Sequence, residues 1–315
     1  MFEYVFMQRG LVVGILLGIV VPLVGVTIVL RRLSMIGDAL SHTSLAGVAG
    51  GLIAGINPVA GAAVACVAGA MCVEGVRKRF KDQSELAVAI VLAAGIGLAG
   101  VLSGFVPNSA SFNSFLFGSI LTISEGEVVS VLGISILALA FCVLLDRELF
   151  LMAFDERHAR VSGVRVSLIN ALYVFVVALV VAVAARTVGS LMVSSMMVVP
   201  VACALQVARS WRQTCIISSA VGVGSAVLGL ILSYVLGLKP GGTIVLLSVA
   251  LLLAIFVVKK AVALVTRRER SSKPSLILTS RIPIDAAHRI APFRGAIFFF
   301  FFGVTTATFP CVCIH

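Results

Sequence analysis

The sequence predicts an all-α membrane protein, built as a bundle of eight or nine transmembrane helices. Of its 315 residues, 60% are hydrophobic and only 12% are charged, and the mean hydropathy is +1.18. A soluble domain does not need so much apolar surface. Apolar stretches of about 20 residues, the length of helix that crosses about 30 Å of hydrocarbon, recur along almost the whole chain. Residues 11–30 are the clearest example.

Nine candidate spans follow one another, and eight is the alternative count. The second and third spans are short and are separated only by a turn signal at Asn57-Pro58. One of them could therefore be re-entrant, or broken where it is buried in protein. The nine candidates are residues 11–30, 40–56, 58–73, 86–106, 128–145, 166–185, 188–207, 215–236 and 243–258.

The net charge is +11, and the basic residues lie between the spans. They follow the odd-numbered spans, whereas the other connections between spans carry only Arg186 and Lys239. The positive-inside rule then predicts an amino terminus outside, a carboxyl terminus in the cytoplasm and an odd number of crossings. Nucleic-acid binding is left without support. The basic residues that follow odd-numbered spans are Arg31, Arg32, Arg77, Lys78, Arg79, Lys81, Arg147, Arg157, Arg160, Arg165, Arg209, Arg212, Lys259, Lys260, Arg267 and Arg268.

Asp38 and His42 bring a carboxylate and an imidazole into the second span. Because they are four positions apart, a helix places them on one face. One carboxylate oxygen and one imidazole nitrogen suit zinc, manganese or ferrous iron. The same spacing equally suits an Asp38–His42 hydrogen bond or a cap at the start of the helix. Spacing alone does not decide between a metal site and a structural pair.

Small residues surround this pair and would let neighbouring helices approach closely. Such a helix packs inside a bundle, so we expect the pair to face a central pathway and not lipid. The small residues are Ser41, Thr43, Ser44, Ala46, Gly47, Ala49, Gly50 and Gly51.

The connection at residues 154–164 predicts a short charged helix outside the membrane. Asp155 suits the N-cap, Ala159 gives a small face, and Gly163 suits the left-handed position that ends a helix. The charged residues Glu156 and Arg157 follow the cap. Such a helix is suited to docking on a cytoplasmic partner, but a solvated interfacial helix without a partner has the same pattern.

Several stretches together resemble the permeases of the zinc, manganese and iron ABC importers, the ABC-3 family. The run Arg-Arg-Leu-Ser-Met-Ile-Gly-Asp-Ala-Leu-Ser-His-Thr-Ser-Leu-Ala-Gly at residues 31–47 resembles the signature after that family's first span. Residues 154–163 resemble its coupling helix, which lies in a groove of the ATP-binding subunit. The resemblance covers about residues 8–265. Further matching stretches are residues 117–121, 188–193, 200–204 and 238–243.

This resemblance implies the type II ABC importer permease fold, in a bacterial cytoplasmic membrane. An external binding protein would deliver the metal ion, and two copies of this chain, or this chain and a close relative, would form the pathway. Two ATP-binding subunits would supply energy. No permanently bound cofactor is expected, since the divalent metal is the cargo. Asp38 and His42 would line the ion route as a transient site. The coupling helix would include Asp155, Glu156, Arg157, Ala159 and Gly163.

The sequence does not predict an enzyme. It contains no Gly-x-x-x-x-Gly-Lys-Ser/Thr P-loop, so ATP hydrolysis is expected on a separate subunit. It also lacks His-Glu-x-x-His and Gly-x-Ser-x-Gly. The alternative function is an ATPase-independent secondary transporter or channel for a cation, which would use the same bundle and ionisable pair. Residues 269–315 depart from the family pattern, so we predict a transmembrane domain at 1–268 and a tail of unknown role at 269–315.

Overall fold

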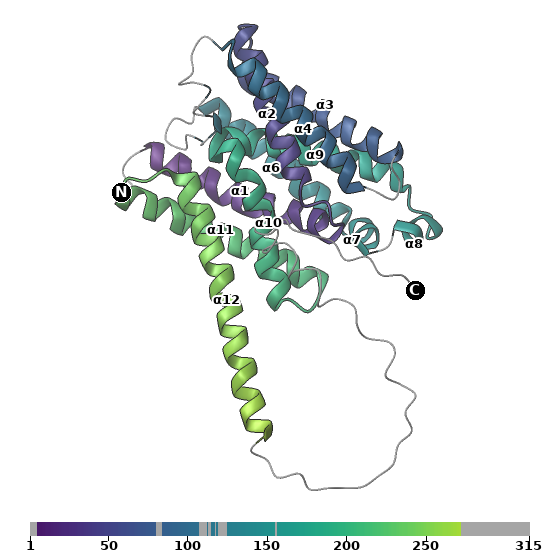
Figure 1. Ribbon diagram of the computed structural model, residues 1–315, viewed down its shortest axis with the longest axis vertical. Helices are drawn as coiled ribbons and strands as arrows, with labels where there is room; N and C mark the ends of the chain where they lie inside the picture. Colours follow the sequence, from purple (N-terminus) through teal and green to yellow (C-terminus); the bar gives the residue numbers. More distant parts are fainter. Residues whose placement is uncertain are drawn as a thin grey trace, which may run out of the picture. The chain divides into compact units, whose positions relative to one another are not determined.

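Helices make up most of the described chain, and nine of them have 18 or more residues (Figure 1). The computed structural model describes residues 5–79, 84–106, 112, 115–116, 118, 125–154 and 156–271. The nine long helices are α1 (Val5–Leu30), α2 (Ile36–Ile53), α3 (Pro58–Arg79), α4 (Ser84–Ser103), α6 (Glu125–Leu144), α9 (Val166–Ala184), α10 (Ser190–Val207), α11 (Trp211–Leu236) and α12 (Pro240–Ser271). The short elements are α7 (Asp146–Phe154), α8 (Glu156–Val161) and a π-helical turn, η2 (Ala185–Gly189).

The chain divides into two units. Residues 1–263 form one compact unit, and the second unit covers residues 264–315. Of the second unit the structure describes only the end of α12, up to Ser271. The predicted domain boundary at residue 268 stays a prediction.

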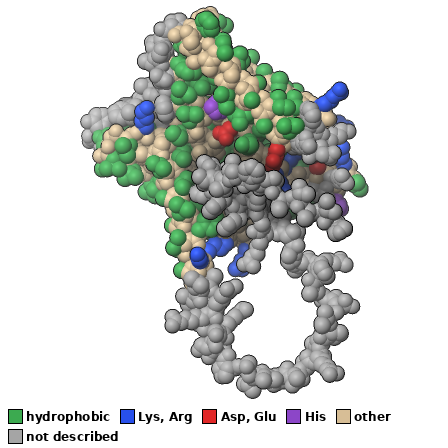
Figure 2. Space-filling model, in the orientation of Figure 1, with side chains coloured by type: hydrophobic (Ala, Val, Ile, Leu, Met, Phe, Trp, Pro, Cys, Tyr) green, Lys and Arg blue, Asp and Glu red, His purple; other side chains and the backbone are tan. Residues whose placement is uncertain are grey.

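The helices confirm an all-helical polytopic membrane protein, and each of the nine corresponds to one predicted span. Seven segments of the described chain are long and apolar enough to cross a membrane, and one of these, Val166–Val207, contains both α9 and α10. The helix α2 is not among the seven, because five of its first nine residues are polar or charged. Figure 2 shows a face that is mostly apolar, with few charged side chains among the green and tan atoms. This is the surface expected of a protein solvated by lipid.

A sharp turn separates α9 from α10, where the sequence predicts a two-residue gap. Gly189 ends η2 with φ at 108°, a conformation that side chains disfavour. Gly118, with φ at 74°, packs against this turn, and a Cβ there would lie 2.3 Å from the Val188 carbonyl. The turn therefore depends on glycine at both positions.

Ion pairs and hydrogen bonds define two ends of the bundle. At one end, which we call the basic end, Arg31 lies near Glu156, Trp211 donates to Asp146 at 2.7 Å, and Lys259 donates to the Gln206 carbonyl. The opposite end holds the Arg9–Glu125 pair at 2.5 Å and the Arg186–Glu127 pair at 2.9 Å. Successive long helices thus alternate in direction between the two ends. Arg31 and Lys259, which follow the first and ninth predicted spans, therefore lie at the same end, as predicted; the orientation of the bundle in the membrane stays a prediction.

The helix α2 lies among α3, α4, α9 and α10. A Cβ on Gly47 would come within 2.4 Å of the Gly61 carbonyl oxygen of α3, so the two backbones are in direct contact. Gly95 of α4 packs in the same way on Thr43. The predicted close approach of neighbouring helices to α2 is confirmed, and it depends on small residues.

We expect Gly47→Ala to lower the thermal stability of the purified protein, whereas Gly50→Ala should not. The added methyl at Gly47 would meet the Gly61 backbone, which cannot rotate away, at a cost of about 1–3 kcal/mol. Gly50 lies on the same helix and has open space around its Cβ position. Unfolding midpoints in one detergent compare the two variants, and equal midpoints would show that the α2–α3 contact tolerates expansion.

Candidate functional site

Asp38 and His42 lie one turn apart near the start of α2, and both are half-buried. Neither has a hydrogen bond or ion pair with any other described residue. The N-cap residue of α2 is Met35, which makes no side-chain cap. The two structural alternatives, an Asp38–His42 hydrogen bond and a helix cap, are therefore not seen, and both side chains remain available to a third group. Within the described residues, no three His, Cys, Asp or Glu side chains cluster as a metal site.

The pair lies beside the seam between α2 and α10. Gly37, next to Asp38, faces Ser194 of α10, where a Cβ would be 3.3 Å from the Ser194 Cβ. Each helix carries one buried hydroxyl a turn away from this contact: Ser41 on α2 and Ser190 on α10. Neither hydroxyl has a hydrogen-bond partner in the described part of the chain. Burying an unpaired hydroxyl costs free energy, so the Ser41 and Ser190 hydroxyls are available to bind a polar ligand or an ion at this seam.

The short helix α8 matches the charged helix predicted from the sequence. It begins at Glu156; Asp155 lies outside the described residues, and the side chain of Arg157 is not described. Gly163 adopts φ 83°, and the Val164 amide donates to the Ala159 carbonyl at 3.1 Å across the end of the helix. This is the predicted left-handed helix ending.

One side of α8 packs on the bundle and the other is exposed. Ala159 is fully buried against Met152 of α7 and Val166 of α9. Its small side chain thus lets α8 lie close to its own chain. On the exposed side of α8, Val161 is 88% accessible, and Phe154, the last residue of α7, is 68% accessible. An open surface hollow of about 720 Å³ adjoins α8, lined by Arg160, Arg165, Val166, Ser167, Leu168 and Ala171.

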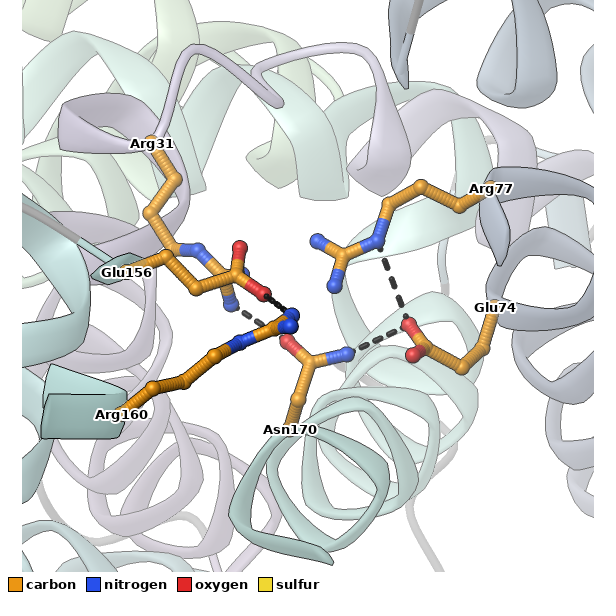
Figure 3. Close-up of polar contacts among 6 residues, drawn as sticks. All are labelled: Arg31, Glu74, Arg77, Glu156, Arg160 and Asn170. Atoms are coloured by element: carbon orange, nitrogen blue, oxygen red, sulfur yellow. Dashed lines mark hydrogen bonds and ion pairs between the residues drawn. The ribbon is translucent and has the colours of Figure 1, made fainter. Parts of the chain in front are cut away.

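A polar network joins α8 to three other parts of the basic end (Figure 3). The Arg31 guanidinium donates to the Asn170 side-chain oxygen of α9 at 2.5 Å and lies 3.6 Å from the Glu156 carboxylate. The Asn170 amide in turn donates to Glu74 of α3, whose carboxylate is 3.4 Å from Arg77. We call the set of six side chains the α8 network: Arg31, Glu74, Arg77, Glu156, Arg160 and Asn170.

The charges of the network set the pKa of Glu156. Burial alone would raise the pKa of this carboxyl, but the hydrogen bond from Arg160 and the charges of Arg77 and Arg31 outweigh burial, so the pKa is lowered. The carboxylate is therefore ionised at neutral pH. Burial is also the largest effect on Arg31, lowering its pKa, and Arg77 lowers it further while Glu156 opposes the change.

Sequence reasoning did not identify Glu74 or Asn170. Glu74 lies near the end of α3, three residues before Arg77, and Asn170 lies in the first turns of α9; both are almost completely buried. Glu74 directly follows the predicted span at residues 58–73, and an ionisable group at the edge of a span is costly if it is buried, so Glu74 could have been noted on that ground. Asn170 is uncharged, and nothing in its local sequence points to a partner that lies 139 positions away.

The fold defines a polytopic helical membrane protein. Residues 3–259 match the ABC 3 transport family, and the chain belongs to this family. It is 36% identical over 257 residues to the "Probable metal transport system membrane protein" of Treponema pallidum, covering 81% of this chain and 96% of that protein. It is 32% identical to the manganese import system permease protein ScaB of Streptococcus parasanguinis, covering 82% and 92%.

A solved structure shares this fold. A chain of PsaBC from Streptococcus pneumoniae, solved in complex with a Fab, superposes with a TM-score of 0.73 at 30% identity, covering 81% of this chain and 92% of that chain. The predicted type II ABC importer permease fold is confirmed. The chain is accordingly a membrane permease subunit with no catalytic role of its own.

Proposed function

We propose that this chain forms the membrane pathway of an ABC importer for a divalent transition metal, with Mn²⁺ as the first candidate cargo. The proposal rests on one observation: Asp38 and His42 share a face of α2, half-buried and without partners among the described residues. Two matched relatives, ScaB and the Treponema protein, bear the names of manganese and metal transport proteins. Zn²⁺ and Fe²⁺ are the alternative cargoes.

The ligands that Asp38 and His42 offer suit a site through which a metal ion passes better than a site that holds the ion permanently. One carboxylate oxygen and one imidazole nitrogen accept first-row divalent ions, but two ligands do not close a tetrahedral site. A conducting site must hold its ion weakly enough to release it. The unpaired hydroxyls of Ser41 and Ser190 add oxygen atoms along the same seam, and oxygen ligands suit Mn²⁺.

The two ends of the bundle would meet different partners. Lys and Arg side chains favour the cytoplasmic side, so the basic end would face the cytoplasm of a bacterial cell and the amino terminus would lie outside. There the exposed side of α8, with Val161 and the following Gly163, would dock on the ATP-binding subunit, next to the exposed Phe154 at the end of α7. The opposite end would receive the metal from an extracytoplasmic binding protein. Two such chains, identical or related, would complete the pathway.

Reconstitution tests this function directly. The chain is placed in liposomes with its ATP-binding subunit and binding protein, and uptake of Mn²⁺, Zn²⁺ and Fe²⁺ is measured in parallel. We expect ATP to raise Mn²⁺ uptake at least fivefold, with the other ions imported more slowly. Equal uptake without the ATPase subunit would instead support a secondary transporter or channel, and uptake of none of the three metals would contradict the proposal.

A further inference from the structure

The α8 network connects α8, the exposed helix at the basic end, to α2, the helix that carries Asp38 and His42. Arg31 follows α1 directly, and α2 begins only five residues later, at Ile36. The same guanidinium contacts Glu156 of α8 and Asn170 of α9. One buried side chain is thus shared between the docking helix and the turn that leads into α2.

The turn between α1 and α2 is held in a fixed conformation. Arg32 adopts φ 59°, which is uncommon for a residue other than glycine. The Leu33 amide donates to the Ile28 carbonyl at 3.0 Å, and the Leu33 side chain is buried. This bond ties the turn back to the end of α1, and the buried Leu33 side chain anchors it in the bundle. We therefore expect a displacement of Arg31 to reach the start of α2, where Asp38 lies.

The charged side chains of the α8 network also lie close enough to interact with one another. Its three arginines face two glutamates, so the described set has one excess positive charge, and the Arg31 side chain is only 6% exposed. Around Arg31 little water screens these charges, whereas Glu156 is about one third exposed and Arg160 is mostly exposed, so screening there is partial. When Glu156 moves with α8, Arg31 has to follow it or lose its ionic partner. The hydrogen bond from Arg31 to Asn170 then changes with it.

We propose that Arg31 and Asn170 are positioning residues that transmit movement of α8 to α2, and so set the geometry of Asp38 and His42. The inference rests on the proposed function, since it requires α8 to bind the ATP-binding subunit. Neither residue contacts the ion. Their role is to make the ion pathway respond to the ATPase.

The test is the number of metal ions imported per ATP hydrolysed in the reconstituted transporter. We expect Arg31→Gln and Asn170→Ala each to lower this ratio at least fivefold, while the ATPase subunit still co-purifies with the chain. Arg212→Gln is the matched control: it removes an arginine at the same end that lies 3.6 Å from Asp146, but whose side chain is 83% exposed. That variant should stay within twofold of wild type, since exposed pairs contribute little.

The ratio separates positioning from stability. A residue that only supports folding would lower the amount of complex, and with it uptake and hydrolysis in proportion, leaving the ratio unchanged. If the wild-type transporter imports metal and the variants keep its ratio of metal ions to ATP, the inference is overturned and the proposed function stands. If Arg31→Gln does not assemble, Arg31→Lys, which keeps the charge but not the planar fork, is expected to lower the ratio in the same direction. Failure of all three variants to assemble would assign a purely structural role.

Discussion

Liposomes that contain the Asp38→Ala or His42→Ala variant should import Mn²⁺ at less than about a tenth of the wild-type rate. Each substitution removes one of the two ligands, and a tenfold loss corresponds to only about 1.4 kcal/mol. Loss of one ligand to an ion that has given up part of its hydration shell should cost at least this much. Asp38→Asn, which keeps the size and one oxygen but not the charge, should fall between Asp38→Ala and wild type.

The controls for this result come from the same helix. Because both side chains are half-buried and have no partner among the described residues, their removal should leave assembly and the unfolding midpoint nearly unchanged. Gly50→Ala alters α2 where there is open space and should transport normally. Normal uptake by both alanine variants would exclude Asp38 and His42 from the route. A shared loss of transport and assembly would indicate a structural pair.

The fold was predictable because lipid imposes a simple rule on the sequence. A span must be long, apolar and helical, so runs such as residues 11–30 specify their own structure without knowledge of partners. The helix α2 is the informative exception. Its five early polar residues exclude it from the segments that are apolar enough to cross a membrane, and two of the five, Asp38 and His42, are the residues that suggested a site. In a membrane protein, departure from the apolar rule is itself evidence of function.

The contacts that surround the site were not predictable in the same way. The sequence identified Asp38 and His42 but could not choose between a metal pair and a hydrogen bond, since that depends on side-chain geometry. It placed Ala159 in a docking helix, and the structure shows that side chain buried against Met152 and Val166. The Arg31–Asn170 bond joins residues 139 positions apart. Such long-range partners follow from tertiary packing and leave no local periodicity.

The second large effect is expected at Gly163, where Gly163→Val should uncouple ATP hydrolysis from transport. Gly163 ends α8 with φ at 83°, and nothing lies within 4 Å of its Cβ position. The cost of valine there is therefore conformational and not steric: a β-branched residue is strained in this region by about 1–3 kcal/mol. Strain of that size is enough to break the bond between Val164 and Ala159 and unwind the last turn of a six-residue helix.

Because α8 would then present a different surface to the ATPase subunit, we expect the metal ions imported per ATP to fall at least fivefold. Gly163→Asn is the matched variant, since asparagine tolerates the left-handed conformation better than any β-branched residue. It should retain most of the coupling although it adds a larger polar side chain at the same exposed position. If asparagine and valine uncouple equally, the exposed surface and not the backbone conformation is what the ATPase recognises. If neither does, α8 is a solvated helix and the docking surface lies elsewhere at the basic end.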